Sequence, residues 1–497
     1  MKPSTMSTSN GALCKSIAIS GLALFMLYTV WSNHANTNYT AADLLLTNLQ
    51  LKWPTSPFTT SSSPNNISTN VVPPTDISHI GFIVVSSLAT WKHRKPYTES
   101  WWRPNSTRGY VFLDKEPTTA EFLHWPATSP PWRVNEDITK LRVYPQLVNP
   151  VEVRIMRSIL DMYRVGDSGL RWFVMADDDT LIFVDNLVEV LGKYDHTEYH
   201  YIGMNSECVK SNADFSFDMG FGGAGYALSY SLVEVLAPKL DACIERYPYL
   251  YVSDHLAQSC LADIGIALTI EKGIHQIDLH GDISGLLSSH PQSPALTLHH
   301  FDAVEPIFPS MDRYEAARHI MKPGNLVADQ SRMLQQTICY QRVKNFSFSV
   351  SWGYSVHIYE TIIPRSILRK PLETFKPWNN HVKYPSFMFN TRRVTNNPCE
   401  APHVFFFQSI ELVPPSSNDH QAVVATMYGR ASARDLPPCS VFGHNHSADS
   451  ISTIRVLSPA PVHKLPDVIE CCDVEYEDGA DIAVIKIRSC TRNEVIA

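Results

Sequence analysis

Short apolar runs alternate with amphipathic segments between residues 77 and 264. The apolar runs at 77–86, 107–113 and 199–204 predict strands. Helices are predicted where apolar residues recur at helical spacing, as they do in 150–163. Three further helices are predicted. One begins at Asp185, and the other two span residues 229–239 and 254–264. Because strands alternate with helices, the pattern predicts an α/β fold with a mostly parallel, doubly wound sheet.

One apolar run, 172–176, ends in three consecutive aspartates, Asp177, Asp178 and Asp179. Open α/β sheets bind their ligands at the carboxyl ends of strands, which is where these side chains fall. Adjacent carboxylates repel one another, so a cation is the natural partner, and Mn²⁺ or Mg²⁺ suits carboxylate and phosphate oxygens. The alternative is a solvated acidic loop in which Asp179 caps the next turn.

The hydrophobic pattern changes around residues 376–383. Beyond it, short β-rich runs such as 403–410 and 482–488 lie among proline-rich turns. We therefore predict an α/β domain over 76–378, followed by a separate cysteine-containing β-rich module over 379–497.

The first 75 residues have a different composition. Residues 16–31 are uncharged and mostly apolar, follow Lys2 and Lys15, and are followed by no Lys or Arg until Lys52. This pattern predicts a single-pass transmembrane signal anchor with residues 1–15 in the cytosol and the rest of the chain in the lumen. Residues 32–75, rich in Pro, Ser and Thr, read as an extended stem. A short span suits a thin early secretory membrane, so we expect a type II protein of the Golgi membrane.

Cysteines and charge narrow the class of protein. Nine of the ten cysteines follow the predicted anchor, and none forms a CxxC pair, so disulfides are expected rather than a zinc ribbon. The odd number leaves one cysteine unpaired or shared between chains, which keeps a homo-oligomer open. Glycosylation sequons, also on the lumenal side, occur at Asn38, Asn66, Asn105, Asn345 and Asn445. A net charge of −8 argues against a nucleic-acid partner.

Two further motifs carry candidate chemistry. In GFGGAGYALS, the glycines Gly222, Gly223 and Gly225 let the backbone pass close to a ligand, or serve a tight turn needed only for packing. In YVSDH, Asp254 falls at a predicted helix start, where it either caps the helix or projects inward as a general base.

Histidines form the last candidate set. His275 and His280 lie in GIHQIDLHGD, where structural roles are the more common ones. His299 and His300 lie in TLHHFD, and a histidine from this distant segment could complete a metal shell begun by the aspartates.

Together, WFVMADDDT, GFGGAGYALS, YVSDH and TLHHFD resemble the motifs of the fringe-related branch of glycosyltransferase family 31, including its plant members. The resemblance covers about residues 77–378. It implies a GT-A fold, which has a Rossmann-like sheet, and an inverting transfer of a sugar from a UDP-sugar donor to a hydroxyl of a glycan or glycoprotein, with a β-1,3 linkage.

The resemblance also assigns roles to individual residues. Asp177, Asp179 and His299 would hold Mn²⁺, with His300 as the reserve ligand. Asp254 would be the catalytic base, and Asp178 would contact the donor. The cleft would be lined by Gly222, Gly223 and Gly225.

Two readings from other classes compete with an enzyme. One is a non-catalytic lumenal protein that uses a retired transferase domain to bind glycans or to scaffold other transferases. The other is a disulfide-rich surface receptor that binds carbohydrate through the C-terminal module. The sequence does not specify the donor sugar, because a few cleft side chains determine it.

Overall fold

The computed structural model of this protein describes residues 73–118, 124–322, 330–378, 385–414, 422–440, 447–460, 470–477, 481–492 and 494. These residues belong to one compact unit, Pro73–Ala497. The predicted cytosolic tail, anchor and nearly all of the stem lie outside them. None of the helices in the described ranges is long and apolar enough to cross a membrane.

A seven-stranded sheet forms the N-terminal part, in the order β3-β2-β1-β4-β7-β6-β8. All neighbouring strands are parallel except β7, which runs antiparallel to both β4 and β6. The expected mostly parallel α/β sheet is therefore present with one reversed strand. Its strands are β1 (Ile80–Val85), β2 (Arg108–Leu113), β3 (Trp132–Val134), β4 (Trp172–Asp177), β6 (Tyr201–Gly203), β7 (Tyr226–Ser229) and β8 (Leu268–Ile270).

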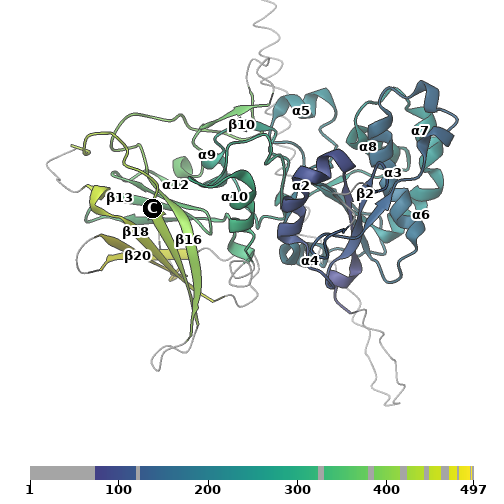
Figure 1. Ribbon diagram of the computed structural model, residues 1–497. Helices are drawn as coiled ribbons and strands as arrows, with labels where there is room; N and C mark the ends of the chain where they lie inside the picture. The colour runs from purple at the N-terminus through teal and green to yellow at the C-terminus, as the bar shows by residue number, and fades with distance from the viewer. Residues whose placement is uncertain are drawn as a thin grey trace, which may run out of the picture. The chain divides into compact units, whose positions relative to one another are not determined.

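Helices pack on both faces of this sheet and bury its central strands on both sides. Apolar residues of α3, α6, α7 and α8 share one cluster with Ile83, Phe173 and Met175, and Figure 1 shows these helices grouped together. Those of α2, α4 and α10 join a second cluster with Phe82 and Val174. The helices are α2 (Leu88–Trp101), α3 (Pro150–Val165), α4 (Val184–Leu191), α5 (Val209–Asp214), α6 (Tyr230–Leu236), α7 (Leu240–Arg246), α8 (Ser253–Asp263), α9 (Ser284–Leu287), α10 (Arg313–Ile320) and α12 (Arg365–Leu368).

Several elements of this part were not predicted from the sequence, and three of them, α2, β3 and β7, show why. Helix α2 carries Pro96 and shows almost no one-sided apolar stripe, so it lacks the amphipathic period. Strand β3 is only three residues long, and all three residues are exposed to solvent. Strand β7 is four residues long and overlaps the end of the glycine motif GFGGAGYALS. Pairing with neighbouring strands, rather than local periodicity, makes β3 and β7 strands.

A second sheet has eight strands in the order β12-β13-β14-β16-β17-β18-β20-β19, part of which is labelled in Figure 1. It begins at Gln336, and Val356 of β14 pairs with Phe405 of β16. Strands from both sides of the expected boundary at Trp378 therefore share one sheet, and the β-rich part starts at Gln336 rather than at 379. Its strands are β12 (Gln336–Gln341), β13 (Phe346–Ser351), β14 (Ser355–Tyr359), β16 (His403–Val413), β17 (Val423–Arg430), β18 (Thr453–Pro459), β19 (Glu470–Tyr476) and β20 (Ile482–Ser489).

Four disulfides confirm the expected oxidised cysteines. They join Cys243 to Cys260, Cys339 to Cys472, Cys399 to Cys439 and Cys471 to Cys490. The first ties α7 to α8, and the other three lie in the β-rich part. Among the described residues Cys208 is the free cysteine, and it is buried.

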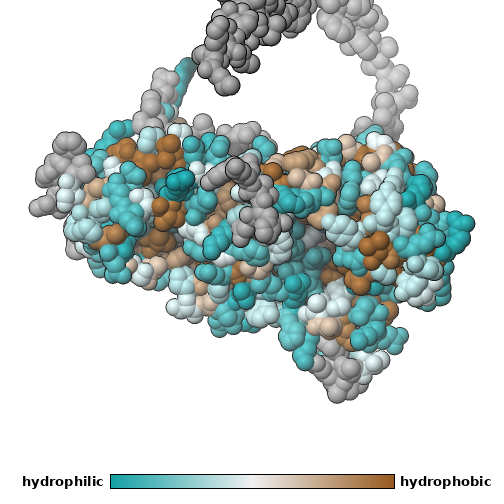
Figure 2. All heavy atoms as spheres, turned by 90° about the horizontal axis from the view of Figure 1, so that it is seen from above, coloured by the Kyte–Doolittle hydropathy of each residue, from teal (hydrophilic) through white to brown (hydrophobic). Residues whose placement is uncertain are grey.

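Two small sheets complete the described part of the chain. Strand β11 (Thr297–Leu298) pairs with β5 (Leu181–Ile182) and with β9 (Ile274–His275), and β10 (Leu279–Gly281) pairs with β15 (Phe375–Pro377). The first of them connects three segments that carry candidate chemistry. On the face shown in Figure 2, hydrophobic residues lie in separate small patches among hydrophilic ones.

Candidate functional site

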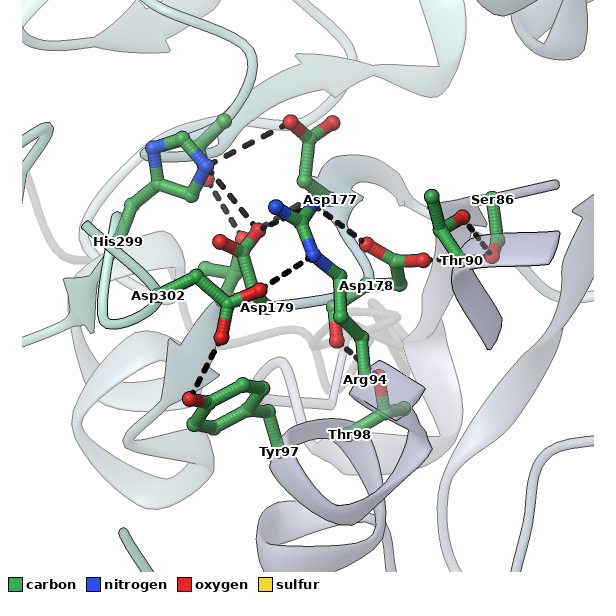
Figure 3. A network of polar contacts seen from close by, with 12 residues as sticks. Ser86, Thr90, Arg94, Tyr97, Thr98, Asp177, Asp178, Asp179, His299 and Asp302 are labelled. Atoms are coloured by element: carbon green, nitrogen blue, oxygen red, sulfur yellow. Dashed lines mark hydrogen bonds and ion pairs between the residues drawn. The ribbon is translucent and has the colours of Figure 1, made fainter. Parts of the chain in front are cut away.

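The aspartate triplet and His299 meet because of one short strand pairing. Asp177 ends β4, and β5 follows the triplet immediately. Thr297 of β11 pairs with Ile182 of β5, so the residue after β11, His299, returns to the end of β4. His299 Nε2 lies 3.5 Å from Asp177 Oδ2 and 3.2 Å from Asp179 Oδ1 (Figure 3). The predicted ligand set is thus assembled from segments about 120 residues apart.

Within this set, the buried carboxylate of Asp179 lacks hydrogen-bond donors. Asp179 is fully buried, and neither of its carboxylate oxygens has a hydrogen-bond partner within the described ranges. Burial would raise the pKa of Asp179, but the charges of His299 and Arg94 outweigh it and hold that pKa well below its usual value. Burial would lower the pKa of His299, and the carboxylates of Asp179 and Asp177 instead raise it to about 10.

These three residues fit a divalent ion. Their ligand atoms lie within 4.8 Å of one another, and two carboxylates with one imidazole suit Mn²⁺. The Asp177 side chain is 35% exposed, whereas Asp179 and His299 are buried. An ion held here would satisfy the buried oxygens of Asp179 and stay open on the Asp177 side to a further ligand.

Asp178 is oriented differently from its two neighbours. Ser86 Oγ donates to Asp178 Oδ2 at 2.6 Å, and Arg94 Nη1 donates to Oδ1 at 3.2 Å (Figure 3). Burial raises the pKa of Asp178 to about 6, against the hydrogen bond from Ser86. Both oxygens are held by the protein, and the predicted contact of Asp178 with a donor stays a prediction.

Arg94 is the residue that sequence reasoning missed. Besides Asp178, its Nη1 lies 3.5 Å from Asp179 Oδ1, and its Nε donates to Asp302 Oδ2 at 2.6 Å. Tyr97 OH donates to the other oxygen of Asp302 at 2.8 Å. Asp302 belongs to the TLHHFD motif, but α2, which carries Arg94 and Tyr97, gave no periodic signal. The one available signal for Arg94 was its basic side chain in the segment that follows the first strand, where it could pair with the aspartates.

The glycine motif separates the ligand set from Asp254. A Cβ added to Gly223 would lie 2.1 Å from His299 Cε1, and one added to Gly222 would lie 2.3 Å from Asp254 Oδ1. Gly225 has φ of +95°, a conformation that favours glycine. The motif therefore does more than turn the chain, because two of its positions leave room only for hydrogen atoms beside two candidate functional side chains.

Asp254 does not cap a helix. Helix α8 begins at Ser253 with Val252 as its N-cap, so Asp254 is its second residue. Its partly buried carboxylate lies against Gly222. Burial raises the pKa of Asp254 to about 7, helped by the charge of Asp177 and opposed by the Gly222 backbone N–H. A carboxylate with a pKa near neutrality suits a general base.

The remaining histidines have other partners. His300 Nδ1 lies 3.0 Å from Asp278 Oδ1, and the His300 ring stacks on Trp378 at 4.5 Å between centroids. His280 stacks on the same indole at 4.4 Å. His300 is therefore engaged away from the aspartates, and His299 is the one that meets them. His275 Nδ1 lies 2.9 Å from Glu207 Oε1, outside this site.

Comparison with known proteins gives two family matches. The family described as "Protein of unknown function, DUF604" matches residues 211–472, and the family described as "Fringe-like" matches residues 137–278. These matches confirm the resemblance inferred from the motifs.

Curated relatives carry the fringe name. Beta-1,3-N-acetylglucosaminyltransferase lunatic fringe from Bos taurus is 28% identical over 186 residues, which cover 34% of this chain and 45% of that protein. Lunatic fringe from Gallus gallus is 34% identical over 82 residues, 14% of this chain and 23% of that protein. The chain thus spans less than half the length of these relatives.

A solved glycosyltransferase that acts in glycosylation of the major capsid of PBCV-1 aligns with 49% of this chain and 98% of its own, with 11% identity and a TM-score of 0.27.

Proposed function

Because this chain belongs to the fringe-related family described as DUF604, we propose that it is an inverting, metal-dependent glycosyltransferase with a GT-A fold. It moves a sugar from a UDP-sugar to a hydroxyl of a glycan or glycoprotein and forms a β-1,3 linkage. The lunatic fringe relatives, named as beta-1,3-N-acetylglucosaminyltransferases, support the class of reaction.

One observation carries the proposal. Asp179 is fully buried, and neither of its carboxylate oxygens accepts a hydrogen bond in the described part of the chain. Its Oδ1 lies 3.2 Å from His299 Nε2, on one side of the glycine motif. Asp254 lies on the other side, against Gly222. An ion site and a base separated by a glycine turn are the two parts that a metal-assisted displacement needs.

Different residues of the chain would hold the metal ion, leave space for the substrates and accept the proton. Asp177, Asp179 and His299 would hold Mn²⁺, which supplies positive charge against the diphosphate leaving group. Gly222 and Gly223 keep the space beside Asp254 and His299 free of side chains. Asp254 Oδ1 takes the proton of the acceptor hydroxyl, whose oxygen attacks the anomeric carbon from the face opposite the leaving group, which inverts that carbon.

Arg94 adds a second source of positive charge. Its guanidinium touches Asp178 and Asp179 and is itself 30% exposed. It offsets the repulsion among the aspartates while the ion is exchanged, and it fixes Asp178 against Ser86.

Calorimetric titration of UDP into the protein, with and without Mn²⁺, tests the proposal. We expect binding that requires Mn²⁺, that Asp177→Ala/Asp179→Ala abolishes and that Asp254→Asn retains. Transfer to a glycan acceptor panel should fall about 10²- to 10⁴-fold in Asp254→Asn, the range for loss of a general base. Binding without transfer by the wild type to any acceptor would favour the non-catalytic glycan-binding reading, and full turnover by Asp254→Asn would exclude Asp254 as the base.

For its location we propose a single-pass type II protein of the Golgi membrane with the described domain in the lumen. The apolar segment at 16–31 behind two lysines supports an anchor. Four disulfides support an oxidising compartment. Protease treatment of sealed microsomes that contain the protein tests the topology. We expect the protease to remove only the short N-terminal segment before the anchor and to leave the rest of the chain intact.

A further inference from the structure

Four ring side chains gather at the start of α8, beside Asp254. Phe215, directly after α5, packs its ring against Tyr251 at 5.8 Å and against His255 at 6.2 Å between centroids. Phe215 also contacts the ring of Phe221, the first aromatic residue of the glycine motif, at 6.3 Å. Tyr251 lies three residues before Asp254, and His255 follows it directly. These four residues, called the aromatic cluster below, therefore adjoin Asp254 from both α8 and the glycine motif.

The aromatic cluster is open to solvent at one member. Phe221 is buried and Phe215 is partly buried, whereas Tyr251 is 52% exposed. Further large apolar residues that are more than half exposed lie in the segments next to it: Val148, Val151, Phe217 and Tyr249. Monomeric proteins rarely expose apolar side chains in groups, and such groups mark binding surfaces.

The segment that carries Tyr251 is fixed by the residues before α3. Asn149 Nδ2 donates to the Tyr251 carbonyl at 3.1 Å, and Val148 N–H donates to the Pro248 carbonyl at 3.1 Å. These two bonds also bring Val148 next to the segment of Tyr251. The exposed ring is therefore presented by an ordered backbone, which reduces the entropy lost when a ligand binds.

The charges at this end of α8 suit a neutral ligand. Ser253 N–H donates to Glu152 Oε2 at 2.8 Å, which fixes an acidic group beside the cluster. Lys210 and Asp214 form an ion pair within α5. Burial lowers the pKa of His255, so this ring is uncharged at pH 7. An anionic ligand would meet carboxylates here and a lysine that is already paired.

We propose that the aromatic cluster binds the acceptor as a neutral sugar ring, which stacks on Tyr251 and brings one of its hydroxyls to Asp254. This inference rests on the proposed function, in which Asp254 takes the proton of an acceptor hydroxyl. One face of a pyranose presents C–H bonds, and these suit the negative face of an aromatic ring. The Tyr251 hydroxyl and the His255 ring offer hydrogen bonds to the other sugar hydroxyls. A sugar uses both the apolar and the polar groups of this surface, whereas an apolar peptide uses only the first.

Saturation-transfer NMR on the full chain with UDP and Mn²⁺ tests the aromatic cluster without requiring turnover. The probes are neutral methyl glycosides of hexoses, deoxyhexoses and N-acetylhexosamines, with methyl glucuronide as the anionic comparison. We expect at least one neutral glycoside to bind. Tyr251→Ala should raise its Kd at least about fivefold, whereas Tyr251→Phe keeps the ring and should bind like the wild type. Tyr199→Ala is the matched control, because Tyr199 is 51% exposed and precedes β6, at the end of the sheet opposite to the site.

Calorimetric titration of UDP separates this inference from the proposed function. Tyr251→Ala should keep the Mn²⁺-dependent UDP binding of the wild type, and for a glycoside that is also an acceptor its KM should rise while kcat is unchanged. A wild type that binds a glycoside through Tyr251 but binds no UDP would refute the transferase and leave the sugar site standing. Three results would overturn the sugar site: no bound glycoside in the wild type, equal affinity in wild type and Tyr251→Ala, or binding of the glucuronide alone. The first of them would assign the exposed rings to a protein contact.

Discussion

Two buried carboxylates in the two large sheets have opposite surroundings. Glu360, directly after β14 in the eight-stranded sheet, is 1% exposed and accepts hydrogen bonds from four groups. The donors are His403 Nε2 at 3.0 Å, Ser447 Oγ at 2.8 Å, Ala448 N–H at 2.7 Å and Cys439 N–H at 3.0 Å. Asp179, after β4 in the seven-stranded sheet, is just as buried, and its oxygens have ion-pair neighbours but no hydrogen bond in the described ranges.

The difference separates an acid that the protein satisfies by itself from one that the proposed function assigns to a metal ion. Burial raises the pKa of a carboxyl, yet the donors around Glu360 lower its pKa to about 2. Glu360 thus joins four segments of the β-rich part and is complete without a ligand. Asp179 is incomplete, because only charges, those of His299 and Arg94, stabilise it. A buried acid without donors indicates a position kept for a cation.

The largest expected effect is on activity, from Asp179→Asn. Loss of one ligand carboxylate should reduce Mn²⁺-dependent transfer at least about 10³-fold, since a bound ion contributes several kcal/mol to the stability of the transition state. The melting temperature is not expected to rise, because Asp179→Asn also removes the charge that pairs with His299 and Arg94. Asp185→Asn, at a half-exposed partner of Arg103, is the control. A lower melting temperature with activity intact would make Asp179 a structural acid like Glu360.

Glu360→Gln should lower the stability of the protein and leave its activity unchanged. Removing the charge of a fully paired buried acid is expected to reduce the free energy of unfolding by about 3 to 5 kcal/mol, while the KM values of the remaining folded enzyme stay unchanged. Urea titration followed by fluorescence measures the loss. Glu475→Gln, exposed beside Lys486 in the same sheet, should change stability by less than about 1 kcal/mol. Equal stability of the two variants would contradict the structural role.

A smaller effect is expected from Gly223→Ala. The new methyl group would meet His299 Cε1 at 2.1 Å, so the ring must move, and overpacking of this kind costs about 1 to 3 kcal/mol. We expect the Kd for Mn²⁺ to increase about 5- to 150-fold by calorimetry. In Gly192→Ala the nearest atom is 3.3 Å away, and the Kd should not change. An unchanged Kd in Gly223→Ala would mean that His299 is not a ligand.

The smallest effect is a pair of opposite pH dependences. The pKa of Glu360 falls from 4.5 to about 2 on folding, so its stabilisation is complete above 4.5 and is lost as the pH falls toward 2. The pKa of Asp178 rises from 3.8 to about 6, so stability decreases as the pH rises from 3.8 to about 6. The urea midpoint of unfolding, measured in EDTA as a function of pH, checks both. Glu360→Gln should lack the loss of stability as the pH falls below 4.5, and Asp178→Asn should lack the decrease as the pH rises from 3.8 to about 6. Parallel profiles for both variants and wild type would contradict the comparison.

The sequence predicted the elements whose periodicity is local. The amphipathic helix near residue 150 and the apolar strand before the aspartates appear as α3 and β4. It missed α2, because Pro96 and scattered aromatic residues hide the helical period, and with it Arg94. It also placed the start of the β-rich part at 379, because nothing local in β12 to β14 shows that they pair with β16.

The amino-acid sequence by itself determined the residue types of the site and their order: three aspartates after a strand, a glycine motif, Asp254 and a late pair of histidines. Only the tertiary structure decided that Glu360 is fully hydrogen-bonded and Asp179 is not. It also places His299, which the resemblance preferred over His300, against the aspartates. The contact of Phe215 with Tyr251 beside Asp254 is decided there as well. The physical reason is that burial and pairing depend on strand registers between distant segments, such as Thr297 with Ile182, which no local pattern specifies.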